Sequence, residues 1–100
     1  MRYTLEIRPA ARQEFDEASD WYNDEAPHVR DRFVGAVDKT IAAVTQRPLT
    51  FPVIYCTKAR RAIVEKFPYS IIFIIDGAQV IIVSIFHDNR NPMIWRRRVG

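Results

Sequence analysis

Two consecutive apolar runs, YSIIFII at residues 69–75 and QVIIVSIF at residues 79–86, restrict the possible folds of this chain more than any other feature. Both runs are apolar at odd and even positions alike, which is typical of strands in the middle of a sheet. Asp76 and Gly77 separate the runs, and these residue types tolerate the positive φ of a tight hairpin turn. The runs therefore predict the two central strands of an antiparallel sheet.

A third strand is predicted just before this hairpin. In RRAIVEKF, residues 60–67, Ile63 and Phe67 fall on one face and Ala62 and Val64 on the other. We expect this strand to complete a three-stranded antiparallel meander. The segment before it, RPLTFPVIYCTKA at residues 47–59, contains two prolines and no sustained period, which indicates a loop.

The first half of the chain predicts one strand and a helical hairpin. Tyr3, Leu5 and Ile7 alternate with polar residues, and Pro9 ends this short strand. Two stripes of apolar residues spaced by three or four positions follow: Ala11, Phe15, Ala18 and Tyr22, then Val29, Phe33, Val37, Ile41 and Val44. Pro27 suits the first turn of the second helix, and so short a connection favours antiparallel packing. We expect Glu14, Asp16, Glu17 and Asp20 to form a solvated acidic side of the first helix.

This order of elements predicts an α+β fold in a single domain over residues 1–100. An N-terminal strand and an antiparallel helical hairpin precede the three-stranded antiparallel meander, all strands forming one curved sheet. A chain of 100 residues can bury one core but not two. If the helical hairpin covers one face of the sheet, we expect the other face to meet water, a ligand or another protein.

Charge and cysteine content narrow the possible partners and location. Residues 1–50 carry a formal charge of −2 and residues 51–100 one of +5, so the second half suits a polyanion or an acidic protein segment. Cys56 is the only cysteine, which excludes an internal disulfide and favours a reducing cytoplasm. The N-terminal residues contain no apolar stretch of signal-peptide length, and the longest apolar run, residues 71–75, cannot span a bilayer. We expect a cytoplasmic protein with no membrane partner.

His87 and Arg90 are the first candidates for chemistry. His87 ends the last predicted strand. In one interpretation it transfers a proton in RNA cleavage while Arg90 stabilises the phosphate. In the other it merely caps a solvated strand end. Lys58, Arg60 and Arg61 open a neighbouring strand and form either an anion site or ordinary surface charge.

The C-terminal segment leaves two alternatives open. In the first alternative, a nucleic acid or an acidic peptide is clamped by Trp95 together with Arg96, Arg97 and Arg98. In the second, Trp95 packs on the core and the three arginines extend into solvent. His28 and His87 are the only histidines, and neither lies in a carboxylate cluster with ligand-like spacing. The three glycines are isolated, so no phosphate-binding loop is present. We expect no metal and no cofactor.

The segment RRAIVEKFPYSIIFIIDGAQVIIVSIFHDNRNPMIWRRR, in this order of elements, resembles the RelE/ParE superfamily of toxins from bacterial type II toxin-antitoxin systems. The likeness is greatest to the plasmid-stabilisation, ParE-like branch and covers nearly the entire chain. It rests on the arginine-rich strand opening, on FPYSIIF, on the central hairpin and on FHDNRNPMIWRRR.

The resemblance implies a toxin that causes growth arrest and is neutralised by a cognate antitoxin, ParD-like or similar. ParE-like members are associated with inhibition of DNA gyrase, and RelE-like members with cleavage of mRNA on the ribosome. We expect no sequence-specific DNA binding by the toxin alone. For a ribonuclease, the expected catalytic residues are His87, Arg61 and Arg90. For antitoxin or target binding, they are Lys58, Arg60, Arg61, Arg90, Trp95, Arg96, Arg97 and Arg98.

Two departures from the ribonuclease pattern favour the gyrase interpretation. Ser70 follows the aromatic residue of the PY pair, where RelE-like nucleases commonly have a basic residue, and Trp95 takes the place of a late tyrosine. The sequence therefore predicts a ParE-like toxin that acts by protein contact. A ribosome-dependent ribonuclease and a non-toxic interaction module on the same fold are the alternatives.

Overall fold

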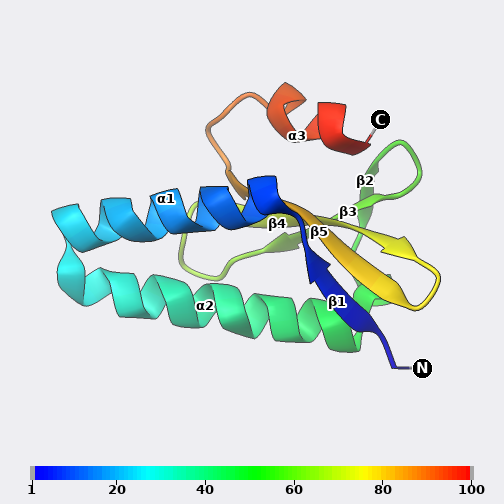
Figure 1. Cartoon of the computed structure of the whole chain (residues 1–100), viewed down its shortest axis with the longest axis horizontal. Coiled ribbons are helices and arrows are strands. Elements are labelled where there is room, and N and C mark those ends of the chain that lie inside the picture. The colour runs from blue at the N-terminus through cyan, green and yellow to red at the C-terminus, as the bar shows by residue number, and fades with distance from the viewer. Residues whose placement is uncertain (1, 100) are drawn as a thin grey trace.

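The computed structural model describes residues 2–99 and has the predicted α+β architecture (Figure 1). Five strands, three α-helices and one short 3₁₀ helix follow one another in these residues: β1 (Thr4–Ile7), α1 (Pro9–Glu25), α2 (Pro27–Gln46), η1 (Pro48–Thr50), β2 (Val53–Tyr55), β3 (Ala59–Ile63), β4 (Tyr69–Asp76), β5 (Gln79–His87) and α3 (Met93–Val99). Pro27 begins α2, as predicted, and Pro9, which was predicted only to end the first strand, also begins α1; a proline at the first helical position gives up no intrahelical hydrogen bond.

The strands form one mixed sheet in the order β1-β5-β4-β3-β2. The pairs β2–β3, β3–β4 and β4–β5 are antiparallel, whereas β1 pairs in parallel with β5. The prediction of four strands was wrong, because Val53–Tyr55 forms β2 instead of a loop. This strand is only three residues long, pairs irregularly with β3 and lies at the edge of the sheet, where the preceding Pro52 is tolerated.

The central hairpin is confirmed, with β4 and β5 paired from Tyr69 and His87 down to Asp76 and Gln79. Gly77 takes the positive φ of +59° that the turn requires. The pairing shifts between Ile72, which lies opposite Ser84, and Phe73, which lies opposite Ile82. Val83 is therefore an extra residue in β5, and this β-bulge lies just beyond the end of β1.

The face of the sheet that packs on α1 and α2, the hairpin face, contains the larger core. Phe33 on α2 is fully buried there together with Ile71, Phe73 and Ile82 of the central strands. The ring of Phe33 lies 4.9 to 6.0 Å, centroid to centroid, from four other aromatic rings: Phe15, Tyr22, Phe67 and Tyr69. The predicted helical stripes therefore meet a single aromatic core.

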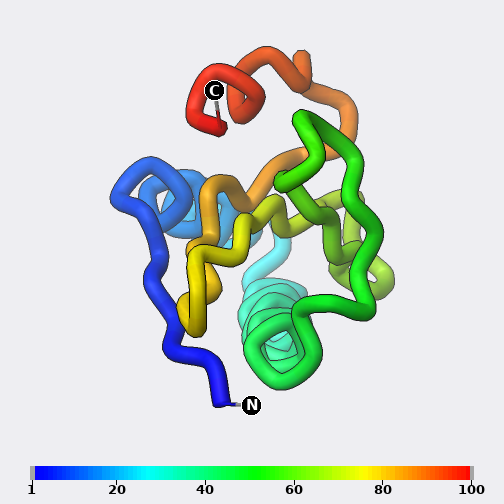
Figure 2. Tube along the Cα trace, turned by 90° about the vertical axis from the view of Figure 1, so that its right-hand side faces the viewer, coloured from blue at the N-terminus to red at the C-terminus, as the bar shows by residue number. Residues whose placement is uncertain are grey.

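The opposite face of the sheet, the α3 face, is covered by the C-terminal helix. Figure 2 shows α3 and α2 on opposite sides of the strands. Trp95 and Val99 of α3 bury Ile72, Val83 and Phe86. The expectation that this face meets water, a ligand or another protein was therefore wrong for its central part, because the sequence reading ended the last element at His87 and missed α3.

Candidate functional site

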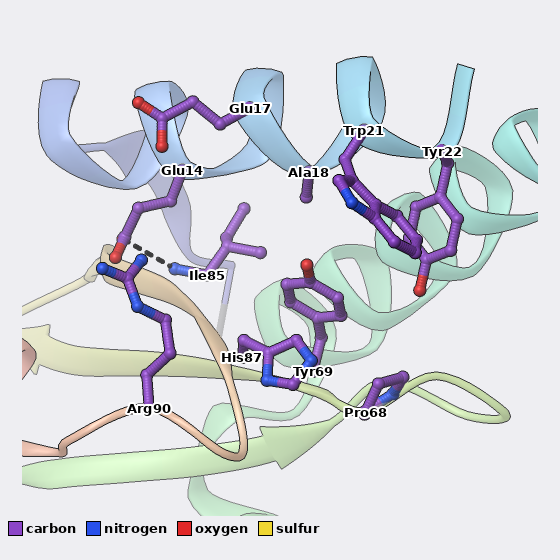
Figure 3. A pocket seen from close by; sticks show the side chains of 10 residues that line it. All are labelled: Glu14, Glu17, Ala18, Trp21, Tyr22, Pro68, Tyr69, Ile85, His87 and Arg90. Carbon is purple, nitrogen blue, oxygen red and sulfur yellow. Dashed lines mark hydrogen bonds between the residues drawn. The ribbon is translucent and has the colours of Figure 1, made fainter. Parts of the chain in front are cut away.

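His87 lies at the end of β5, in a pocket between α1 and the sheet (Figure 3). The pocket has a volume of about 480 Å³, and its lining combines four aromatic side chains with the charged groups of two carboxylates and one arginine: Trp21, Tyr22, Tyr69 and His87, with Glu14, Glu17 and Arg90. Arg90 reaches into the same pocket and extends toward Glu14 of α1 (Figure 3). The structure thus brings together His87 and Arg90, two of the three predicted catalytic residues.

Two contacts fix the His87 ring. Tyr69 lies directly opposite on β4, and the two rings meet edge to face at 5.0 Å. The Nδ1 atom accepts a hydrogen bond from the backbone N–H of Asn89 at 3.1 Å, which leaves Nε2 as the nitrogen available to a ligand. Burial raises the pKa of the Tyr69 phenol, as does nearby Tyr22, while Arg90 acts in the opposite direction.

Arg61 belongs to a separate polar cluster on the α3 face. Its Nε donates to the hydroxyl of Ser70 at 2.8 Å, and that hydroxyl donates to Asp88 Oδ1 at 2.7 Å. The guanidinium also lies 3.4 Å from the same carboxylate oxygen. The Arg61 guanidinium therefore already has two partners, Ser70 and Asp88, within the described chain.

The sheet separates His87 from Arg61. Side chains alternate between the two faces of a strand, and Arg61 pairs with Ile72 in the α3-face core, whereas His87 pairs with Tyr69 beside the hairpin-face core. The notch beside Arg61, about 220 Å³, is lined by Ser70, Asp88 and Arg90 but not by His87. Arg90, in the turn after β5, is the only member of the predicted trio that reaches both sites.

Lys58 and Arg60 have different surroundings despite their proximity in sequence. Lys58 is exposed in the turn before β3. The guanidinium of Arg60 donates to the carbonyl oxygen of Phe51 at 2.6 Å and to that of Leu49 at 3.4 Å. Arg60 thus holds the segment after η1 against the sheet, which is a structural role that its position in the sequence did not indicate.

Trp95 and the three arginines lie on α3 and do not act as one group. Trp95 is only 3% exposed and meets Tyr55 edge to face at 5.6 Å, so the core-packing alternative is the one observed. The guanidinium of Arg96 lies over the Tyr55 ring at 5.0 Å. Arg97 is exposed, whereas Arg98 turns back to the body of the protein.

Arg98 and Glu14 form a partly buried ion pair between α3 and α1. Arg98 Nη1 lies 2.8 Å from Glu14 Oε1, and the same carboxylate oxygen accepts bonds from the Ser84 hydroxyl at 2.9 Å and the Ile85 backbone N–H at 3.3 Å. Arg98 also donates to the carbonyl oxygen of Val83. Since β1 ends at Ile7, opposite Ile82, these two side chains satisfy backbone groups that β1 no longer reaches. The expectation that the acidic side of α1 is solvated was wrong for Glu14.

A family model described as the ParE toxin of the type II toxin-antitoxin system parDE matches residues 5–92. The chain belongs to this ParE toxin family. Among solved structures, the chromosomal ParDE TA system from P. aeruginosa is similar, with a TM-score of 0.75 and 19% identity over 85% of this chain and 95% of that chain. This second likeness shows the fold, and comparison with curated proteins gives no significant match.

Membership in the ParE family makes this a toxin of a type II toxin-antitoxin system and supports a cognate antitoxin as its partner. The residues described by the structure contain no group of three or more His, Cys, Asp or Glu side chains that could hold a metal ion. None of the helices in residues 2–99 has the length and apolar character needed to cross a membrane.

The sequence did not predict the contacts of three polar residues at these sites: Glu14, Ser70 and Asp88. Glu14 carried a signal, since it lies three residues after Ala11 and four before Ala18, on the apolar stripe of α1. Ser70 was noted only as a missing basic residue. Nothing in the local sequence shows that Asp88, 27 residues after Arg61, returns to pair with it.

Proposed function

We propose that this ParE-family toxin inhibits DNA gyrase by protein contact and that its cognate antitoxin neutralises it. The separation of His87 from Arg61 by the sheet is the observation that supports this most. Cleavage of RNA by proton transfer needs the acid or base and the phosphate-stabilising cation at hydrogen-bond distance from one phosphodiester, about 3 Å from the reacting atoms. Groups on opposite faces of a sheet do not meet this condition.

The state of Arg61 supports contact over cleavage as well. A cation stabilises the developing charge of a phosphorane best when it is not already paired with another anion. Arg61 is already bound to Ser70 and lies 3.4 Å from Asp88, so a phosphate would have to displace a carboxylate first.

The α3 side of the molecule is the surface that we assign to the target. Lys58, Arg90 and Arg97 are exposed there, and none of them forms an ion pair within residues 2–99. Arg96 adds a guanidinium held by Tyr55 next to the notch beside Arg61. Such a cationic surface favours fast association with an acidic partner and adds to affinity where charges are desolvated.

A ribosome-dependent ribonuclease is the second candidate, because His87, Arg90 and Tyr69 do share one pocket. In that mechanism His87 would transfer the proton and Arg90 alone would stabilise the phosphate. Because Arg90 is the single cation in the lining of this pocket, this is the weaker candidate.

Induced expression in growing cells separates the candidates. We expect incorporation of labelled thymidine to fall first, followed by filamentation and a DNA-damage response, while methionine incorporation continues. An early stop in methionine incorporation would contradict gyrase inhibition and favour the ribonuclease. Unaffected growth, with the protein present at normal level, would favour a non-toxic interaction module.

A further inference from the structure

The His87 pocket contains several polar groups that the fold leaves without partners. Five groups in its lining make no hydrogen bond within residues 2–99: the indole N–H of Trp21, the phenol groups of Tyr22 and Tyr69, Nε2 of His87 and the guanidinium of Arg90. The pocket volume of about 480 Å³ lies in the range of small-molecule sites. Free polar groups that converge on such a cavity indicate a ligand.

Each of these free groups can donate a hydrogen bond at neutral pH. Nδ1 of His87 accepts a bond from the Asn89 N–H, so the neutral ring carries its proton on Nε2. Burial raises the pKa of the Tyr22 and Tyr69 phenols, so both keep their protons. Arg90 has no ion-pair partner in the part of the chain that the structure describes. The pocket therefore suits a ligand with acceptor oxygens and a negative charge.

Charges of both signs lie at one end of the pocket (Figure 3). Glu14, Glu17 and Arg90 gather there, and the same three residues line a smaller adjacent cavity along α1. The Glu14 carboxylate is already bound by Arg98 at 2.8 Å, whereas Glu17 is exposed and has only Gln13 as a partner. One free carboxylate and one free guanidinium remain at this end. A ligand with one ammonium and one carboxylate group matches them, whereas a phosphate dianion would meet one cation and two carboxylates.

The other end of the pocket is aromatic. Trp21 and Tyr22 extend into it from α1, and Tyr69 and His87 enter it from the strands (Figure 3). Trp21 is 57% exposed, so much of its ring is free to contact a ligand. Ala18 lies between the two ends, and its single methyl group leaves the space between them open. A planar ring gains contact area and edge-to-face packing at this end.

We propose that the His87 pocket binds a free aromatic α-amino acid. Its ring packs against Trp21 and Tyr69, its carboxylate binds Arg90 and its ammonium group binds Glu17. The remaining donors of the lining are available to the carboxylate oxygens or to a hydroxyl group on the ring. The inference goes beyond the proposed function, because the target surface lies on the α3 side and shares only Arg90 with this pocket.

Calorimetric titration of the full chain with L-phenylalanine tests this proposal. We expect one site with a dissociation constant on the order of 0.1–1 mM, which is typical of so small a ligand. Phenethylamine lacks the carboxylate and phenylpropionate lacks the ammonium group, so each should bind at least about 10-fold more weakly. Absence of L-phenylalanine binding at about 10 mM ligand would overturn the proposal.

Two variants locate the charged groups of the ligand. Arg90→Gln should weaken binding of L-phenylalanine and phenylpropionate at least about 10-fold but not that of phenethylamine. Glu17→Gln should weaken binding of L-phenylalanine and phenethylamine but not that of phenylpropionate. Arg32→Gln and Glu25→Gln are the controls, because they remove the same charges at exposed positions outside the pocket and should change each constant less than about twofold. Equal effects of the pocket variants and the controls would contradict the assignment.

Tryptophan fluorescence shows where the ligand binds. Trp21 lines the pocket, whereas Trp95 is only 3% exposed and lies on the α3 face. L-phenylalanine does not absorb at wavelengths that excite tryptophan alone, so the change on titration should come from Trp21. Trp21→Phe keeps an aromatic ring and should still bind in calorimetry while losing the fluorescence change. A change that persists in Trp21→Phe would place the ligand near Trp95 and overturn the assignment.

Two further ligands test the chemical class. Adenosine monophosphate offers a planar ring with a phosphate dianion, and N-acetylphenylalanine imitates the C-terminal residue of a peptide. Both should bind at least about 10-fold more weakly than L-phenylalanine. Tighter binding of either would overturn the amino-acid assignment, in favour of a nucleotide or of a peptide terminus. These titrations need no toxicity, so this inference and gyrase inhibition can fail independently.

Discussion

The hairpin face and the α3 face of the sheet are covered by very different amounts of protein. On the hairpin face, two long helices cover the central strands, and five aromatic rings surround or include Phe33. On the α3 face, one helix of seven residues covers a smaller core, and polar pairs hold its margins. We therefore expect the hairpin face to supply most of the stability, while the α3 face presents the polar pairs.

This difference explains why the predicted functional residues do not form one centre. The His87 side chain lies on the hairpin face, beside the aromatic core, where Tyr69 packs against it. Arg61 ends on the side of α3, where Ser70 and Asp88 bind it. A fold that places its histidine and its strand arginine on opposite faces suits recognition by contact more than catalysis.

Removing Phe33 tests the hairpin face and should have the largest effect. Phe33→Ala deletes a fully buried ring that touches four others, which typically costs about 3–5 kcal/mol of unfolding free energy. Urea denaturation followed by circular dichroism measures this loss. A cost below about 1 kcal/mol would show that the aromatic cluster does not carry the stability of the domain.

Removing Trp95 tests the α3 face and should cost about 3 kcal/mol, the lower end of the usual range for a buried aromatic residue. Trp95 is as buried as a core residue, but the short α3 can detach while the hairpin-face core stays intact. Hydrogen exchange of Trp95→Ala should show lost protection in residues 93–99 and retained protection in β4 and β5. Global loss of protection would mean that the two faces unfold as one unit.

The Glu14–Arg98 pair should couple by about 1–2 kcal/mol in a double-mutant cycle with Glu14→Gln and Arg98→Met. The pair is short and its side chains are only 12% and 26% exposed. Arg12 and Asp16 provide the matched control, because this exposed pair at 3.5 Å on α1 should couple by about 0.3–0.5 kcal/mol. Equal coupling energies in the two cycles would remove the role of Arg98 as the tie between α3 and α1.

Tyr69 should give the smallest effect, a pH dependence at alkaline pH. Because burial raises the pKa of its phenol above the ordinary value of 10.0, the folded protein holds this proton more tightly than the unfolded chain. Its contribution is therefore complete below pH 10 and is lost as the pH rises through the raised pKa. Tyr69→Phe should show a weaker decline of stability above pH 10 in thermal melts.

Arg90→Gln sharpens the same test. Arg90 lowers the pKa of Tyr69, so its removal should move the tyrosine titration, followed by ultraviolet absorbance, to still higher pH. An unchanged titration would show that Arg90 does not act on the His87 pocket in solution.

The elements that could be predicted from sequence are those with a strong local signal. The turn at Gly77 is confirmed because glycine permits a positive φ, and the helix start at Pro27 is confirmed because the proline ring fixes φ at a helical value. β2 and α3 were missed because each is short. Their stability comes from neighbours distant in sequence, such as Tyr55 against Trp95, and not from any periodicity of their own.

The candidate sites were less predictable than the fold. His87 and Arg90 were found because they stand together after the last strand, and they share a pocket. Arg61 was grouped with them, but the structure places it on the other face of the sheet. Only the register of the strands decides this, because a shift of the pairing by one residue moves every side chain of a strand to the opposite face. The roles of Arg60 and Glu14 depend on partners outside their own elements, which no local pattern encodes.

The most direct test of the central claim, action by contact, is made with purified protein. Wild-type chain and His87→Ala are added separately to a gyrase supercoiling reaction and to translating ribosomes with a defined mRNA. We predict that both proteins inhibit supercoiling to the same extent and that the mRNA stays intact. Cleavage of the mRNA by the wild type, reduced about 10²- to 10⁴-fold in His87→Ala as expected for a lost proton-transfer group, with supercoiling unaffected, would contradict the account.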